Sequence, residues 1–229
     1  MGYNRRSCYR IPAPDRQRPD GFGQETGRTT RLVRSAGSER VTMSTMLGLF
    51  LQPHSETPCS AVSRIGVRLI VLPEGALSLS YQLEAKLDQL RIPAPNPAPC
   101  RRDELWRNTC FEVFIAVDGE RGYREFNFSP SGDWAVYEFD DYRFGMRSPE
   151  MPVALRLDVF HEVDGLRLDV TLPPGLIQAN PAASSPLRLA IATVIELADG
   201  SHGYWALRHP PGKPDFHHAS GFDMRLAVC

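Results

Sequence analysis

The strongest constraint on the fold is a two-residue alternation of apolar and polar side chains, in short runs separated by turn sequences. In residues 76–85 every second side chain is large and apolar and those between are polar: Leu77, Leu79, Tyr81 and Leu83 alternate with Ser78, Ser80, Gln82 and Glu84. Successive side chains of a β-strand point to opposite faces, so this run predicts a strand with one buried face. Pro73-Glu74-Gly75 separates it from the apolar run 64–72, which is the signature of a hairpin.

Runs of the same kind continue to the C-terminus, at 110–117, 123–128, 133–139, 153–159, 166–172, 187–197, 203–208 and 222–228. Only residues 174–179, with a proline near the first turn, predict a short helix. About ten strands at a spacing of roughly 8–12 residues predict an all-β fold, and we expect an antiparallel β-sandwich in preference to a closed barrel.

The first 45 residues do not share this pattern. They are rich in Arg, Gly, Ser, Thr and Pro, and their few large apolar residues follow no period. Such a segment cannot bury enough apolar surface to offset the entropy lost on ordering. We therefore expect residues 1–45 to be a disordered basic tail or a non-native extension, and residues 46–229 to form one β-sandwich domain.

Charge and composition argue against several kinds of partner. Residues 1–46 carry nine arginines and four acidic residues, whereas residues 47–229 carry 17 basic and 23 acidic residues. A mildly acidic domain is a poor nucleic-acid binder. No apolar run approaches the ~20 residues of a membrane helix, and no signal-peptide pattern is visible. The five scattered cysteines match neither a disulfide framework nor a zinc motif. We expect a cytoplasmic protein without nucleic-acid or membrane partners, and the sequence indicates no particular protein partner.

The first candidate site combines carboxylates, an amide and an indole. If the runs 110–117 and 123–128 pair as neighbouring strands, Glu112, Glu125 and Asn127 lie together on the face that points away from the core. Trp106 enters from the preceding loop. Carboxylate and amide oxygens accept hydrogen bonds from hydroxyl groups, and an indole packs on the C–H patch of a sugar ring. This group of residues therefore suits a carbohydrate or polyol.

Two other interpretations of these residues stay open. The face can be an ordinary solvated one, with its carboxylates balanced by Arg107 and Arg124. Glu112 and Glu125 can also form a glycosidase acid/base pair, since neighbouring strands reach the required carboxyl separations. A strand face without a deep cleft, however, rarely raises the pKa of a carboxyl as acid catalysis requires. The chain also lacks the standard catalytic motifs, so we expect a non-enzymatic protein.

The second candidate segment, residues 204–218, holds several metal-ligating side chains close together: His209, Asp215, His217 and His218. Adjacent histidines point apart in an extended chain and three prolines stiffen the loop, so this pattern does not favour a metal site. Trp205, on a strand near the C-terminus, is by itself more typical of a core residue than of a ligand platform.

These segments carry a family resemblance. LWRNTCFEVFIA, YREFNFSPSGDWAVYEFDDYRFGM and YWALRHPPGKPDFH resemble the bacterial DOMON-like proteins, which are related to the family 9 carbohydrate-binding modules. The resemblance spans about residues 49–226 and implies an antiparallel β-sandwich. It also implies a sugar clamp between Trp106 and Trp205, with Glu112, Glu125 and Asn127 as polar contacts. The residues after the first tryptophan depart from the family pattern, because Arg107-Asn108-Thr109 stands where acidic residues are usual.

The resemblance also suggests two possible cofactors, calcium and haem. Some family 9 relatives bind calcium, for which the sequence shows no site, and some DOMON proteins bind haem through Met and His ligands. Met146 with His209, His217 or His218 is the corresponding set here, although a methionine in such a run is typical of packing. The sequence thus predicts a non-catalytic module that binds a carbohydrate or polyol. The alternatives are a haem-binding domain and a scaffold or protein-interaction domain without a small ligand.

Overall fold

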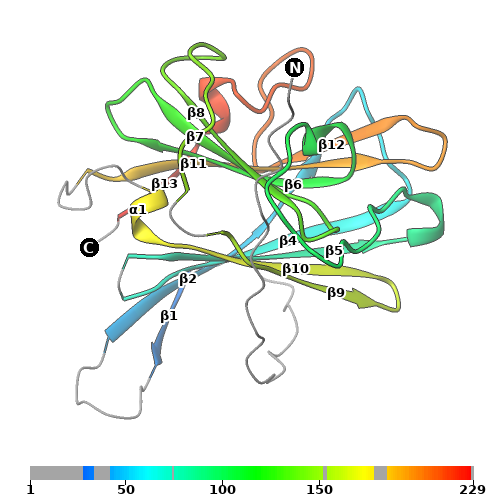
Figure 1. Cartoon of the computed structure of the whole chain (residues 1–229), viewed down its shortest axis with the longest axis horizontal. Coiled ribbons are helices and arrows are strands. Elements are labelled where there is room, and N and C mark those ends of the chain that lie inside the picture. Colours follow the sequence, from blue (N-terminus) through cyan, green and yellow to red (C-terminus); the bar gives the residue numbers. More distant parts are fainter. Residues whose placement is uncertain (1–27, 34–41, 74, 152–153, 178–184, 228–229) are drawn as a thin grey trace.

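Two antiparallel sheets face each other in the computed structural model, which describes residues 28–33, 42–73, 75–151, 154–177 and 185–227. Figure 1 shows the two layers one above the other. The lower layer has six strands in the order β1-β2-β4-β5-β10-β9, and the upper has seven, in the order β3-β12-β11-β6-β7-β8 with β13 also pairing with β11. The expected antiparallel β-sandwich is therefore confirmed.

The six-stranded sheet is built mainly from the N-terminal third and one later hairpin. Its strands are β1 (Arg28–Val33), β2 (Thr42–Phe50), β4 (Val62–Val71), β5 (Leu77–Ala85), β9 (Leu157–Glu162) and β10 (Gly165–Leu172). The seven-stranded sheet takes the middle and end of the chain. Its strands are β3 (Gln52–Pro53), β6 (Cys110–Val117), β7 (Tyr123–Phe128), β8 (Trp134–Phe139), β11 (Leu187–Glu196), β12 (His202–Ala206) and β13 (Met224–Leu226).

The core lies between the sheets and follows from the alternation in the sequence. In β5 every second side chain is fully buried and those between are partly exposed. Tyr81 of β5 crosses the core, and its hydroxyl donates a 3.0 Å hydrogen bond to the backbone carbonyl of Glu112 in β6. A buried hydroxyl needs such a partner. The bond also ties the six-stranded sheet to the strand that carries a candidate site residue.

The N-terminal segment departs from expectation. Within residues 1–45, expected to lack structure, the structure has β1 and the beginning of β2, which pair along their length. A ladder of backbone hydrogen bonds requires no apolar period in the side chains, so neither the composition nor the missing period excludes it. Residues 1–27 and 34–41 lie outside the described residues. The described residues accordingly form thirteen strands, against about ten expected.

Helical structure is confined to short pieces among the described residues. The expected helix at 174–179 is present as α1 (Pro174–Ile177), and its last two expected residues lie outside the described part. Three single 3₁₀ turns are η1 (Leu87–Gln89), η2 (Leu105–Arg107) and η3 (Ala219–Gly221). No helix in the described part of the chain is long and apolar enough to cross a membrane.

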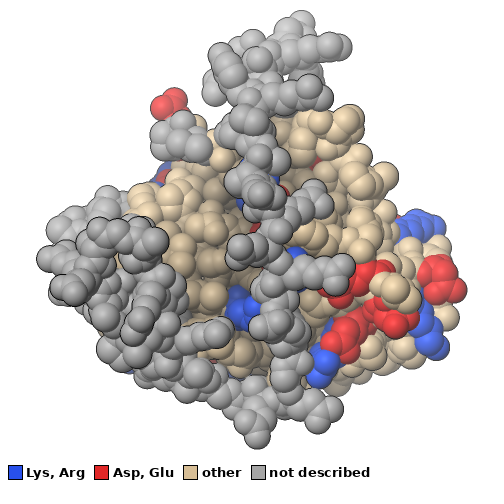
Figure 2. Space-filling model, turned by 90° about the horizontal axis from the view of Figure 1, so that it is seen from below, with Lys and Arg blue, Asp and Glu red and all other residues tan. Residues whose placement is uncertain are grey.

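The outward faces of the two sheets differ. Figure 2 views the molecule from the side of the six-stranded sheet, where acidic and basic side chains mix at one end of the face. The outward face of the seven-stranded sheet instead carries a second apolar cluster, including Phe114, Tyr137 and Phe222. Loops 140–147 and 207–222 supply lining residues over this face, and the candidate site lies beneath them.

Candidate functional site

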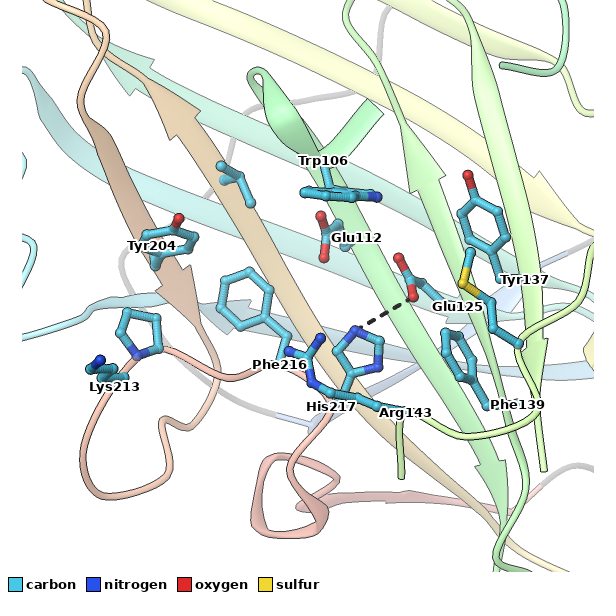
Figure 3. A pocket seen from close by; sticks show the side chains of 13 residues that line it. Trp106, Glu112, Glu125, Tyr137, Phe139, Arg143, Tyr204, Lys213, Phe216 and His217 are labelled. Carbon is cyan, nitrogen blue, oxygen red and sulfur yellow. Dashed lines mark ion pairs between the residues drawn. The ribbon is translucent and has the colours of Figure 1, made fainter. Parts of the chain in front are cut away.

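A cavity of about 510 Å³ lies on the outward face of the seven-stranded sheet. Its floor comes from β6, β7, β8, β11 and β12, and its walls from η2 and the two covering loops. The lining side chains, shown in Figure 3, are Trp106, Glu112, Glu125, Tyr137, Phe139, Arg143, Met146, Val194, Tyr204, Lys213, Pro214, Phe216 and His217. Segments more than 100 residues apart in sequence thus meet around one space.

Glu112 and Glu125 share this face because β6 and β7 pair through a tight hairpin. Glu112 lies opposite Asn127 and Glu125 lies opposite Phe114, so the two glutamates are diagonal neighbours. The expected pairing of these strands is confirmed. Both carboxylates point into the cavity in Figure 3, yet Glu112 is only 3% exposed and Glu125 4% exposed.

The expectation of an ordinary solvated face does not hold. Glu112, Glu125 and Asn127 are all buried. The two arginines expected to balance them bind elsewhere, since Arg107 pairs with Glu104 at 2.8 Å and the Nε of Arg124 donates to Glu138 at 2.8 Å. The sequence pattern could not show the covering loops, which contact this face only in the tertiary structure.

A hydrogen-bond network holds Glu125 in place. The amide of Asn127, fully buried beside it, donates to its Oε1 at 2.7 Å. Nε2 of His217 lies 3.7 Å from its Oε2. The Tyr123 hydroxyl accepts from the backbone N–H of Arg143 at 3.1 Å and lies 2.7 Å from Nδ1 of His217. Donation from this hydroxyl to Nδ1 leaves the imidazole proton on Nε2, facing the carboxylate, and we assign His217 this tautomer.

Burial controls the protonation of these groups. Desolvation raises the pKa of Glu125 to about 7, against the lowering effects of the Asn127 hydrogen bond and the Arg143 charge. Desolvation, followed by the charge of Glu125, raises the pKa of Glu112 well above its ordinary range. Desolvation also lowers the pKa of His217 to about 4, so its imidazole is neutral at pH 7. The cavity thus holds two carboxyl groups beside a neutral histidine.

Glu112 differs from its neighbour in having no partner. Its Oε1 is buried and makes no hydrogen bond with any described residue. Leaving a buried polar atom without a partner costs about 1–3 kcal/mol, so such atoms are rare unless something else binds them. The Glu112 side chain lines the cavity, so its carboxyl group is placed to accept hydrogen bonds from a ligand there.

Aromatic rings enclose the carboxylates on several sides. Trp106 of η2 is 43% exposed and forms part of the wall, while Tyr204 and Phe216 lie on one side of the cavity and Tyr137 and Phe139 on the other (Figure 3). The guanidinium of Arg107 lies 5.2 Å from the centre of the Trp106 ring. This contact favours one orientation of an otherwise exposed indole.

The structure does not bring Trp205 to the cavity. Its side chain is 5% exposed and belongs to the apolar core between the sheets. Tyr204, the preceding residue of the strand, points to the opposite face of the sheet and lines the cavity in place of Trp205. The predicted clamp of two tryptophans across the cavity is therefore wrong. Trp106 lines the cavity, and the second aromatic side chain near it is Tyr204 instead of Trp205.

The covering loops are fastened to each other. Asp215 accepts from the Tyr142 hydroxyl at 2.6 Å and from the Arg143 guanidinium at 2.9 Å. Gly145, at φ 72°, allows loop 140–147 to turn tightly, because a Cβ there would lie 2.2 Å from Oδ2 of Asp140. Arg143 itself has a φ of 51°. Residues in this region of backbone space are often held at functional sites.

The residues do not fit the cofactors that the resemblance raised. In the described part of the chain, no three His, Cys, Asp or Glu side chains gather as a metal site. Met146 and His217 both line the cavity, as a haem ligand pair requires. Both ring nitrogens of His217, however, face protein groups. The ring has no free lone pair for iron, and we assign it no haem role.

The sequence pattern grouped only three of the thirteen side chains that line this cavity. It singled out Trp106, Glu112 and Glu125, which the structure brings together, and Asn127, which supports Glu125 from beneath. It did not identify Arg143, Tyr204, Phe216 or His217 as parts of the same site. A usable signal was the Asp215–His217 segment, whose polar residues serve here as loop fastenings instead of metal ligands.

Comparison with known proteins shows the fold. No family model matches the chain, and no curated protein sequence matches it. A crystal structure of a proposed carbohydrate-binding protein from Bacteroides uniformis superposes with a TM-score of 0.56 at 12% identity, over 76% of this chain and 83% of that one. A family 9 carbohydrate-binding module from Caldicellulosiruptor kristjanssonii, in complex with cellotriose, gives a TM-score of 0.43 at 11% identity, over 72% and 74% of the two chains. At these identities the first likeness establishes the β-sandwich fold, and the second carries no argument.

Proposed function

We propose that this chain binds a carbohydrate or related polyol in the cavity on the seven-stranded sheet and does not alter it chemically. The observation that carries the proposal is the pair of buried carboxyl groups facing an accessible cavity, with Oε1 of Glu112 lacking a partner in the described structure. Hydroxyl groups of a sugar are donors of the right kind for these oxygens.

The rest of the cavity supports the same ligand class. Small-molecule sites combine mostly apolar walls with a few placed polar groups, and a volume of about 510 Å³ suits one or two sugar rings. Trp106 and Tyr204 offer ring faces for the C–H side of a sugar. The resemblance of residues 49–226 to DOMON-like proteins and family 9 modules points in the same direction.

Calorimetric titration of the full chain with mono- and disaccharides tests the proposal. We expect saturable binding by wild type and a loss of at least about tenfold in affinity for Trp106→Ala, since an aromatic platform contributes about 1 kcal/mol or more. The matched control, Phe160→Ala on the other sheet, should bind like wild type. Chromatography of the recovered sugar should show no new product. Absence of binding across the panel by folded protein, or turnover of the sugar, would contradict the proposal.

A further inference from the structure

We propose that the ligand carries a protonated amine, which lies between the carboxylates of Glu112 and Glu125. This inference rests on the proposed function and narrows it from sugars in general to amino sugars and related amino polyols. It depends on charge and placement within the cavity, and each step can be followed in Figure 3.

The first step is that the two carboxylates have no cation of their own. Glu112 forms no ion pair among the described residues, and the only such contact of Glu125 is with His217, which is neutral at pH 7. Two buried carboxylates without a counter-charge are strongly disfavoured, and burial accordingly raises the pKa of both groups and favours their protonated forms in the unliganded protein. A cation supplied from outside would remove this conflict.

The second step is that no nearby cation is paired with Glu112 or Glu125 among the described residues. The guanidinium of Arg143 lines the cavity but is paired with Asp215 at 2.9 Å. Arg107 is paired with Glu104. Lys213 is exposed at the end of a covering loop. Among the described residues, no arginine or lysine therefore forms an ion pair with Glu112 or Glu125, and an ammonium group could replace the protons that their raised pKa values favour.

The third step concerns space and direction. Diagonal neighbours on paired antiparallel strands have their Cβ atoms roughly 7 Å apart, which leaves room for one small group between the carboxyl ends. Asn127 already occupies Oε1 of Glu125, and Nε2 of His217 lies 3.7 Å from its Oε2, too far for a hydrogen bond, so this Oε2 and one oxygen of Glu112 can still accept from a ligand in the cavity. An ammonium group has three N–H donors, enough for both oxygens and one more partner.

The fourth step is the indole. Trp106 stands in the cavity wall near these carboxylates (Figure 3). The face of an indole attracts cations, and a Trp is the strongest aromatic partner for one. Two carboxylates and an aromatic face together select a cationic amine over a hydroxyl group of the same size.

Titrations of the full chain at pH 7 with D-glucosamine, D-glucose and N-acetyl-D-glucosamine test the inference, because the first differs from the second only in the amine and from the third in its charge. We expect D-glucosamine to bind about tenfold more tightly than either neutral sugar, as charge-assisted hydrogen bonds are roughly twice as strong as neutral ones. In Glu112→Gln the preference should fall below about threefold, whereas the matched control Glu84→Gln on the other sheet should keep it. Circular dichroism checks that Glu112→Gln and Glu84→Gln fold. If Glu112→Gln does not fold, Glu125→Gln takes its place in the titrations.

The outcomes separate the inference from the function on which it rests. If D-glucose binds as tightly as D-glucosamine, the inference that the ligand carries an amine is wrong, and the proposed sugar binding stands. If D-glucosamine is preferred but Glu112→Gln and Glu125→Gln both keep the full preference, the amine lies elsewhere and the inference is overturned. If none of the sugars binds to folded protein, the proposed function fails and the inference fails with it.

Discussion

The outward faces of the two sheets carry similar residue types but organise them in opposite ways. On the six-stranded sheet, the polar face formed by Arg64, Ser80, Gln82, Glu84 and Asp169 is solvated and internally paired. Arg64 donates to Glu84 at 3.0 Å, Ser80 to Asp169 at 2.6 Å, and Gln82 to Glu162 at 2.7 Å. Each of these carboxylates has a partner on another strand of the same sheet.

On the seven-stranded sheet, the site face formed by Glu112, Glu125, Asn127 and Tyr123 is covered by loops. There one glutamate is held by its neighbours and the other has an unpartnered oxygen. The difference teaches that alternation alone does not distinguish a surface from a site. What marks the site is a pair of buried carboxyl groups that line a cavity, one of them with an oxygen that has no partner in the described structure.

The largest expected effect separates the two tryptophans. Trp205→Ala should lower the free energy of unfolding by about 3–5 kcal/mol, because it leaves a cavity in the core between the sheets. Trp106→Ala, on the exposed wall of the site face, should lower it by less than about 1 kcal/mol. Urea denaturation measures both. Equal losses would show that Trp106 is also a structural residue and would weaken its role as a platform.

The next effect is the pH dependence of stability, which comes from the buried carboxyl group of Glu125 on the site face. The pKa of Glu125 is raised to about 7 in the folded state, so the folded protein holds that proton more tightly than the unfolded chain does. Stability is therefore lost as pH rises from about 4.5 to about 7. Glu125→Gln cannot ionise and keeps the Asn127 hydrogen bond. It should be more stable than wild type by about 3 kcal/mol at pH 8, and equal to it near pH 4. Denaturation of both proteins at the two pH values measures this, and equal stability at pH 8 would contradict the burial of this carboxylate.

The smallest effect belongs to the polar face. Asp169 accepts from Ser80 and lies 3.2 Å from Arg167, with both charged side chains partly solvated. Exposed ion pairs contribute little, so Asp169→Asn should change the free energy of unfolding by no more than about 1 kcal/mol at pH 8. A change as large as that of Glu125→Gln would remove the distinction between the two faces.

The fold was largely predictable because strand alternation reports one buried face directly. The position of β5, the pairing of β6 with β7 and the short helix at Pro174 all followed from local pattern and turn residues. The pairing of β1 with β2 did not, since backbone hydrogen bonding leaves no mark on the side-chain sequence.

Only the site residues on or just before strands β6 and β7 were predictable from the sequence. Glu112, Glu125 and Asn127 followed from register, and Trp106 from its position before β6. The strand position of Trp205 by itself favoured a core residue, which the structure confirms, whereas the family resemblance assigned this tryptophan to the sugar clamp, which is wrong. The roles of Arg143 and His217 depend on two loops about 70 residues apart meeting through Asp215, which no local pattern encodes.

The central claim, that the site face binds a saccharide, is tested most directly by the three indole N–H signals in a ¹H–¹⁵N correlation spectrum. The chain has three tryptophans, and single Trp→Phe variants assign their signals. Trp106 lines the cavity, whereas Trp134 and Trp205 are buried in the core. During titration with the saccharide panel, the account predicts that the Trp106 signal shifts saturably while the other two stay in place. A Trp106 signal that does not move while folded protein binds the sugar, or that stays fixed throughout the panel, would contradict it.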